Sequence, residues 1–396
     1  MNFNFIQKQP KTKIEVGVLL LWEPIMHFFK YFLLSSFILL GQQSIASEHE
    51  FWLVDEFLAQ HPEQEGISQA FADIVRQPAT PLHIPPLKPV KIAVVYPANQ
   101  ISDYWVRSIK SFEARLKELN IPYEIESFLT QSTHNESLRD QAKEILTAVN
   151  SEADYLILTL YKKQHKAIIE RLISNQKTKV ILQNITTPIK AWGNLQPFMY
   201  VGFDHVKGTQ LIADWYIKQE IRHKRYGLLH FPKGYISQVR GDSFIEYTNA
   251  HSELNLVSSY YTNSTRQNAY QNAINMLNEN RHLGFIYASS TDIALGVSDA
   301  IAEQKRQNKV LVNGWGGGSA ELDAIAQGKL DVTVMRMNND NGVAMAEAIK
   351  LDLTGNKTQV PVIYSGDYEL VTKDLSPAKL LRLKQHAFRY SGMTDK

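Results

Sequence analysis

From residue 90 onward, apolar segments alternate with amphipathic segments, and this alternation constrains the fold more than any other feature of the chain. The apolar segments are nearly continuous, as in KIAVVYP and DYLILTL, which is typical of parallel strands buried on both faces. The segments between them carry apolar residues at helical spacing, as at Val106, Ile109 and Phe112. The sequence therefore predicts the α/β class, with helices covering both faces of parallel sheets.

About ten strand–helix units can be distinguished, and they divide into two doubly wound lobes. The predicted strands of the first lobe are 91–97, 123–128, 154–160, 179–186 and 198–204. Those of the second lobe are 226–231, 256–262, 284–290, 309–315 and 330–337. The final segment, SPAKLLRLKQHAFRY, predicts a helix that is capped by Ser376 and has Pro377 at its first position.

The two lobes are expected to exchange chain segments at a hinge of three strands. The predicted crossings lie near Gly202–Asp204, Met337–Asn338 and Ser365–Asp367. The N-terminal lobe would then consist of residues 90–203 with 338–365, and the C-terminal lobe of residues 204–337 with 366–396.

The start of the chain reads as a secretion signal. A lysine precedes an apolar run, and the small residues Ser44 and Ala46 stand before a cleavage position ahead of Ser47. The apolar run is about half of the ~20 residues that a membrane-spanning helix requires, which favours a cleaved signal over an uncleaved anchor. We therefore interpret residues 1–46 as a leader with its signal peptide at 26–46, and we expect export to the periplasm.

Residues 47–89 separate this leader from the lobes. Leu53, Phe57 and Leu58 have helical spacing, as do Ala70 and Ile74. Five prolines then fall between positions 78 and 89, a density that forbids a helix and favours an extended linker. The sequence predicts an N-terminal helical arm tied to the lobes by a stiff connection.

Composition excludes several classes of function. The chain has no cysteine, which excludes disulfides, Cys-ligated metals and thiol catalysis. Without the leader it carries 38 basic and 38 acidic residues, so it lacks the positive charge typical of nucleic-acid binding. The twelve histidines are scattered, and we interpret them as surface or core residues and predict no metal site.

Polar and aromatic residues stand directly after the predicted strands, where parallel sheets bind their ligands. The set includes amides, hydroxyls, indoles and two arginines: Gln100, Ser102, Trp105, Gln183, Asn184, Arg240, Ser290, Thr291, Asp292, Trp315 and Arg336. No nucleophile–base pair is evident, so neither catalytic residues nor a cofactor is predicted and the chain is not expected to be an enzyme. Two guanidiniums in one cleft require a compensating charge, because a buried unpaired charge is costly. The expected ligand is therefore small and rich in hydroxyls, and it is either negatively charged or carries a strongly polar cluster of oxygens. A structural ion pair for each arginine is the alternative.

Several long runs of sequence carry a family resemblance. VVYPANQISDYWVRSI, ILQNITTP, YVGFDH, GYISQVRGDSF, STDIALG, NGWGGGSAELDAI and VTVMRMNNDNG resemble the LuxP family, within the ribose-binding-like, type I periplasmic binding protein superfamily. The resemblance extends from about Phe51 to Ser391.

This resemblance implies a quorum-sensing receptor. The family's ligand is autoinducer-2, held between the lobes as a cyclic furanosyl borate diester. By resemblance its contacts carry over to eight residues: Gln100, Ser102, Trp105, Asn184, Arg240, Thr291, Trp315 and Arg336. The two arginines would neutralise the borate, and lobe closure would signal to the membrane sensor kinase LuxQ. The main alternative is the sugar-binding component of an ABC transporter.

One short motif invites a different interpretation. The glycine-rich stretch Gly314–Ser319 lacks the Lys-Ser/Thr of a phosphate-binding loop and the third glycine of a dinucleotide fingerprint. We expect its glycines to let the backbone approach the ligand and turn into a helix at Ser319.

Overall fold

The computed structural model describes residues 50–98, 100–131, 136–150, 152–159, 163–307 and 309–392. From Glu50 onward these residues form one compact unit. The leader predicted for residues 1–46 lies outside the described residues, so its cleavage stays a prediction. Among the described residues, no helix combines the length and the apolar character needed to cross a membrane.

The first of two sheets has six strands within the described residues, each parallel to its neighbours, in the order β11-β5-β4-β3-β1-β2. Its strands are β1 (Val90–Ala98), β2 (Tyr123–Gln131), β3 (Tyr155–Leu158), β4 (Lys179–Gln183), β5 (Met199–Gly202) and β11 (Ile363–Ser365).

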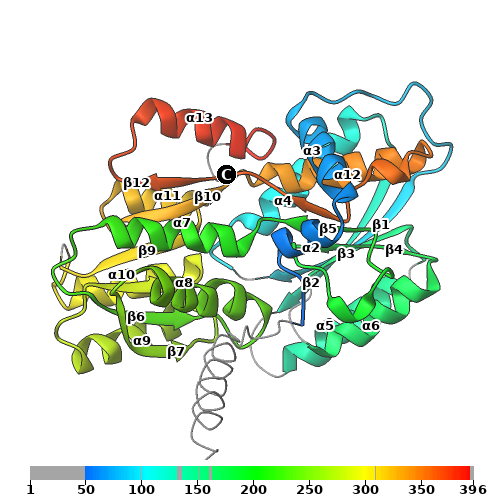
Figure 1. Cartoon of the computed structure of the whole chain (residues 1–396). Helices are drawn as coiled ribbons and strands as arrows, with labels where there is room; N and C mark the ends of the chain where they lie inside the picture. Colours follow the sequence, from blue (N-terminus) through cyan, green and yellow to red (C-terminus); the bar gives the residue numbers. More distant parts are fainter. Residues whose placement is uncertain are drawn as a thin grey trace, which may run out of the picture. The chain divides into compact units, whose positions relative to one another are not determined.

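Alternate residues of β1 enter two separate apolar cores, one on each face of this sheet. Ile92 and Val94 pack with helices α4 (Tyr104–Glu118) and α12 (Asn339–Leu353). Ala93 and Val95 pack on the other face with α5 (Glu136–Asn150) and α6 (Lys163–Asn175), as the positions of these helices in Figure 1 also show. Burial on both faces is the physical reason for the continuous apolar runs in the sequence.

The second sheet has the order β12-β10-β9-β8-β6-β7 in the described part of the chain. Its strands are β6 (Arg225–His230), β7 (Asn255–Tyr261), β8 (Phe285–Ala288), β9 (Leu311–Gly316), β10 (Val332–Arg336) and β12 (Tyr368–Thr372). Its helices are α7 (His205–Lys218), α8 (Ser243–His251), α9 (Arg266–Glu279), α10 (Thr291–Glu303), α11 (Ser319–Ala326) and α13 (Pro377–Ala387).

One edge strand departs from the parallel pattern. β12 runs antiparallel to β10, with Tyr368 opposite Arg336. The chain comes directly from β11 and enters the second sheet at the edge where β10 ends, so it can only run backwards along β10. Parallel pairing would have required a long crossover connection, and only Gly366 and Asp367 lie between β11 and β12.

Three segments connect the two sheets, between β5 and α7, between β10 and α12, and between β11 and β12. The segments are joined by three hydrogen bonds: Gly366 N to Gly202 O at 2.8 Å, Met337 N to Asp367 O at 2.8 Å, and Asp204 N to Ser365 Oγ at 3.0 Å. The predicted fold class, two doubly wound lobes on a three-strand hinge, is confirmed. The lobe boundaries themselves stay a prediction.

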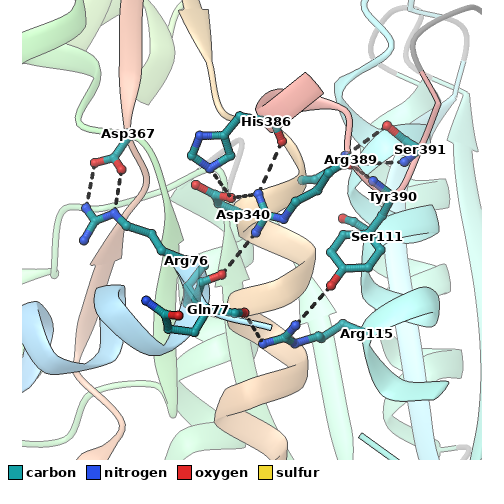
Figure 2. Close-up of polar contacts among 12 residues, drawn as sticks. Arg76, Gln77, Ser111, Arg115, Asp340, Asp367, His386, Arg389, Tyr390 and Ser391 are labelled. Carbon is teal, nitrogen blue, oxygen red and sulfur yellow. Dashed lines mark hydrogen bonds and ion pairs between the residues drawn. The ribbon is translucent and has the colours of Figure 1, made fainter. Parts of the chain in front are cut away.

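The N-terminal arm consists of α2 (Val54–Gln60) and α3 (Glu63–Arg76). Phe71 of α3 is fully buried in the core beneath α4 and α12. Figure 2 shows Arg76, at the end of α3, paired through two nitrogens with both carboxylate oxygens of Asp367 at 2.9 and 3.0 Å. Residues 78–89 then form neither helix nor strand, as their prolines predict.

The C-terminal helix has the predicted start. Ser376 is the N-cap of α13 and its hydroxyl accepts a hydrogen bond from Lys379 N at 3.3 Å, while Pro377 takes the first helical position. The tail beyond α13 lies against the arm, where Arg389 Nη2 donates to Val75 O at 3.1 Å (Figure 2).

Candidate ligand-binding site

A small cavity lies where the carboxyl ends of the two sheets meet. All eight residues predicted for the site line it: Gln100, Ser102, Trp105, Asn184, Arg240, Thr291, Trp315 and Arg336. The first four come from the first lobe and the last four from the second. The structure therefore brings together residues that span more than half of the chain, although no observation yet tests their contact with a ligand.

Arg240 is buried at the back of this cavity. It lies in a single π-helical turn, Ser237–Asp242, that follows β6 and precedes α8. Its guanidinium carbon is 3.6 Å from the ring centroid of Trp315, and its Nη1 donates to Ser289 O at 3.0 Å. The indole face and the carbonyl orient the guanidinium without neutralising its charge.

Arg336, the last residue of β10, is the second buried cation. Its guanidinium carbon lies 4.2 Å from the ring centroid of Tyr104, and its Nη1 is 3.5 Å from Asn184 Oδ1. In the part of the chain that the structure describes, no carboxylate forms an ion pair with either Arg240 or Arg336. The described contacts therefore contain no structural ion pair for either arginine, which was the alternative expectation.

The electrostatics of the pair follow from burial and mutual repulsion. Burial, followed by the charge of Arg336, lowers the pKa of Arg240 to about 9, and burial lowers the pKa of Arg336. The carboxylate of Glu321 acts in the opposite direction on the pKa of both arginines, and that of Asp103 on the pKa of Arg336, so described residues compensate the two charges in part. An anion in the cavity would add to this compensation.

The two indoles are held more tightly than the sequence suggests. Trp315 is only 1% exposed, and its Nε1 donates to Thr209 Oγ1 at 3.1 Å. One face of its ring is covered by Arg240, so this face orients the guanidinium and is not free to stack on a ligand ring. Trp105 packs on Tyr104 and Tyr96, with ring centroids 4.9 and 5.4 Å away.

Six residues line the cavity besides the eight expected ligand contacts: Tyr104, Phe231, Ile236, Ser264, Ser290 and Asp292. Ser290 and Asp292 were expected after their strand, whereas the other four were not predicted. Gln183, also expected after a strand, is fully buried and does not line the cavity. Asp292 Oδ1 accepts a hydrogen bond from Ile101 N at 3.1 Å, which joins the second lobe to the first. Burial raises the pKa of Asp292 above its ordinary value.

A second contact between the lobes lies beside the cavity. Asp103, just before α4, accepts a hydrogen bond from Ser319 N at the start of α11, at 3.1 Å. Arg107 Nη2 donates to Ser319 Oγ at 2.7 Å from the same helix α4. Together with the bond between Asp292 and Ile101, these contacts hold the lobes closed over the cavity.

The glycine-rich stretch makes room for two polar groups at the cavity. A Cβ on Gly316 would stand 2.8 Å from Arg336 Nη2, and a Cβ on Gly318 would stand 2.2 Å from Asp103 Oδ1. The expected approach of this backbone to a ligand stays a prediction. The helix does begin at Ser319, as predicted.

Comparisons with known proteins place this geometry in context. Residues 92–357 match the sequence profile described as a periplasmic binding protein domain. The chain is 25% identical, over 68% of its length and 86% of the relative, to the D-allose-binding periplasmic protein of Escherichia coli strain K12.

Two solved structures share the fold at low sequence identity. An ABC transporter periplasmic solute-binding protein from Actinobacillus succinogenes 130z, with bound D-allose, has a TM-score of 0.61 at 20% identity, covering 72% of this chain and 98% of that chain. The fructose-binding periplasmic domain of a hybrid two-component system has a TM-score of 0.64 at 15% identity, covering 75% and 94%.

Proposed function

We propose that this chain, which belongs to the periplasmic binding protein family, is a periplasmic quorum-sensing receptor that binds autoinducer-2 between its lobes. The ligand would be held as its furanosyl borate diester by Gln100, Ser102, Trp105, Asn184, Arg240, Thr291, Trp315 and Arg336. The protein would act by binding and closing, without chemical turnover and without a cofactor.

The observation that carries this proposal is the pair of buried arginines without ion-pair partners in the described part of the chain. A neutral sugar has hydroxyls for the amides and hydroxyls of the cavity but adds no charge to the partial compensation that Glu321 and Asp103 provide for the two arginines. A cyclic borate diester offers the same hydroxyl-rich ring and adds one negative charge. It therefore suits the cavity better than an ordinary pentose or hexose.

Signalling would proceed by closure of the lobes. The bonds from Asp292 to Ile101 and from Asp103 to Ser319 form only when the two lobes approach each other. A ligand that contacts both lobes stabilises this arrangement by its preference for the closed state. A partner that contacts both lobes would then distinguish bound from free receptor.

The proposed partner is the periplasmic domain of the membrane sensor kinase LuxQ. The fold likeness to a periplasmic domain of a two-component system supports a sensory role for this architecture. We expect the association of the purified protein with this kinase domain to change when ligand is added, as measured by isothermal titration calorimetry. Identical association with and without ligand would contradict the signalling step.

The alternative function is the sugar-binding component of an ABC transporter, in the periplasm as well. The relative that binds D-allose and the solute-binding protein of an ABC transporter favour this alternative. Under it the two arginines would have no anionic partner in the complex.

A tryptophan-fluorescence titration separates the two functions, because Trp105 and Trp315 both line the cavity. The titrants are autoinducer-2 precursor with borate, the precursor without borate, D-ribose and D-allose. We expect saturable binding of the precursor that strengthens with borate. Trp215→Phe, on α7 outside the cavity, should retain the signal and serves as the matched control. A response to a neutral sugar alone would refute the autoinducer-2 assignment and favour the sugar-binding alternative.

A further inference from the structure

His205 is the first residue of α7 and lies directly behind the cavity, which it does not line. Only 1% of the residue is exposed. Its Nε2 is 3.1 Å from the backbone oxygen of Asn184 in the first lobe. Its Nδ1 is 3.4 Å from both Nε and Nη2 of Arg240 in the second lobe. The imidazole thus connects a predicted ligand contact of each lobe.

The two neighbours determine the protonation of this ring. A carbonyl oxygen can only accept a hydrogen bond, so Nε2 of His205 carries the proton and donates to Asn184. A guanidinium can only donate, so Nδ1 is unprotonated and accepts from Arg240. Burial, followed by the charge of Arg240, holds the pKa of His205 well below its usual range. His205 is therefore a neutral ring with one defined tautomer.

This arrangement decides which side of Arg240 a ligand can meet. The edge of the guanidinium formed by Nε and Nη2 faces His205. Only the edge formed by Nη1 and Nη2 remains for the cavity, and Nη1 also donates to Ser289 O. That edge can hold an anionic oxygen pair through two parallel hydrogen bonds.

We propose that His205 is a positioning residue of the ligand-binding site: its neutral ring holds Arg240 so that the guanidinium presents its Nη1–Nη2 edge to the ligand. This inference rests on the proposed function in one respect, that a ligand binds in this cavity. It does not depend on which ligand that is.

The surroundings of the ring predict how acid would act. Arg240 and Arg336 are the cations that oppose its protonation, and the phenol of Tyr235, 6.0 Å away between ring centroids, has a pKa raised by burial to about 12. Its neighbour Asp204 caps α7, accepting hydrogen bonds from Val206 N and Lys207 N. A proton on Nδ1 would remove the acceptor for Arg240 and place a third cation beside the pair.

The test compares three variants by calorimetric titration, with precursor plus borate and with D-ribose as probes. His205→Ala should lower the affinity for whichever probe the wild type binds by about tenfold or more. His205→Gln, which keeps a neutral donor and acceptor, should restore most of that affinity. His251→Gln, an exposed histidine on α8 of the same lobe, should leave affinity unchanged.

The pH dependence gives a readout that a merely structural role would not move. Because the pKa of His205 is held well below its usual range, wild-type affinity should not fall on account of this ring from neutral pH to about pH 5. It should fall in stronger acid, where His205 gains a proton, and His205→Gln should lack the part of that fall due to His205. Thermal unfolding of each variant without ligand checks that the fold is intact. Equal affinity of wild type and a folded His205→Ala would overturn the proposal.

A ligand-free measurement separates this inference from the proposed function. Heteronuclear NMR of the ring nitrogens should find His205 as the Nε2–H tautomer at neutral pH. The Nδ1–H tautomer, or a charged ring, would overturn the positioning role whatever the ligand. If the protein binds D-ribose alone, the autoinducer-2 assignment is refuted. If the affinity for D-ribose is then lost in His205→Ala and restored in His205→Gln, the role of His205 is still supported.

Discussion

At the scale of single residues, the two buried guanidiniums of the cavity contact neutral side chains. Arg240 lies between the ring of Trp315 and the imidazole of His205, and Arg336 lies over the ring of Tyr104. Aromatic faces and neutral acceptors orient a guanidinium while leaving its charge uncompensated. The charge then remains available to a ligand, whereas an ion pair with a carboxylate would neutralise it.

This view predicts opposite effects of one substitution on binding and on stability. Arg336→Met should weaken ligand binding by ~2–5 kcal/mol, as loss of one partner of a desolvated charge pair does. The free energy of unfolding of the ligand-free protein should stay the same or rise, because an unpaired buried charge is removed. Calorimetry and urea unfolding measure the two quantities.

The matched control is Arg266→Met, which removes an exposed arginine paired with Asp299 on α10. It should leave ligand binding unchanged. Full affinity in Arg336→Met would remove Arg336 from the site.

At the scale of elements, the packing of α4 against α12 anchors the first lobe. Arg115 of α4 and Glu347 of α12 are 1% and 2% exposed, and their ion pair is 2.6 Å long. Arg115 also donates to Gln77 O at the end of the arm and to Tyr390 Oη of the tail (Figure 2). A single buried guanidinium thus joins two helices, the arm and the tail.

Loss of the charge on Glu347 should therefore destabilise the protein. Glu347→Gln keeps the shape of the side chain but leaves Arg115 as a buried charge without its main partner, at a cost of ~3–5 kcal/mol of unfolding free energy. Urea unfolding checks the value. Glu253→Gln breaks the exposed pair with Lys224 and should leave stability unchanged. Equal stability of both variants would contradict the anchoring role of the pair.

At the scale of the whole unit, function depends on the balance between open and closed lobes. The three hinge segments are short and joined by hydrogen bonds, which favours rotation of the lobes as rigid bodies. The closed form gains the contacts of Asp292 and Asp103 across the cleft. Ligand contacts and these direct bonds between the lobes therefore stabilise the same state.

Removal of a direct bond between the lobes should shift this balance. Asp103→Ala removes the acceptor for Ser319 N, together with the ion pair to Arg107 and a charge that acts on Arg336, and should weaken ligand binding by ~1–2 kcal/mol. Without ligand, Asp103→Ala should have a larger radius of gyration than the wild type, as measured by small-angle X-ray scattering. Asp299→Ala, whose ion pair lies within the second lobe, is the control. Unchanged affinity and radius in Asp103→Ala would show that this bond does not bias closure.

The sequence by itself determined the fold class and part of the cavity lining. Burial on both faces requires continuous apolar strands, as in β1, so the pattern is visible without coordinates. Polar residues at the ends of the strands could be predicted because parallel strands gather their carboxyl ends at one edge, and the family resemblance selected the eight expected contacts. Ser376 and Pro377 marked the start of α13 because helix caps depend only on neighbouring residues.

Only the tertiary structure decided how those groups are held. His205 was interpreted as a surface or core residue, because its partners Asn184 and Arg240 are 21 and 35 positions away and no local spacing connects them. The direction of β12 and the close approach of Gly316 to Arg336 likewise depend on contacts between distant segments. Local patterns report what a segment buries, whereas the orientation of a buried polar group depends on partners that only the folded chain brings near.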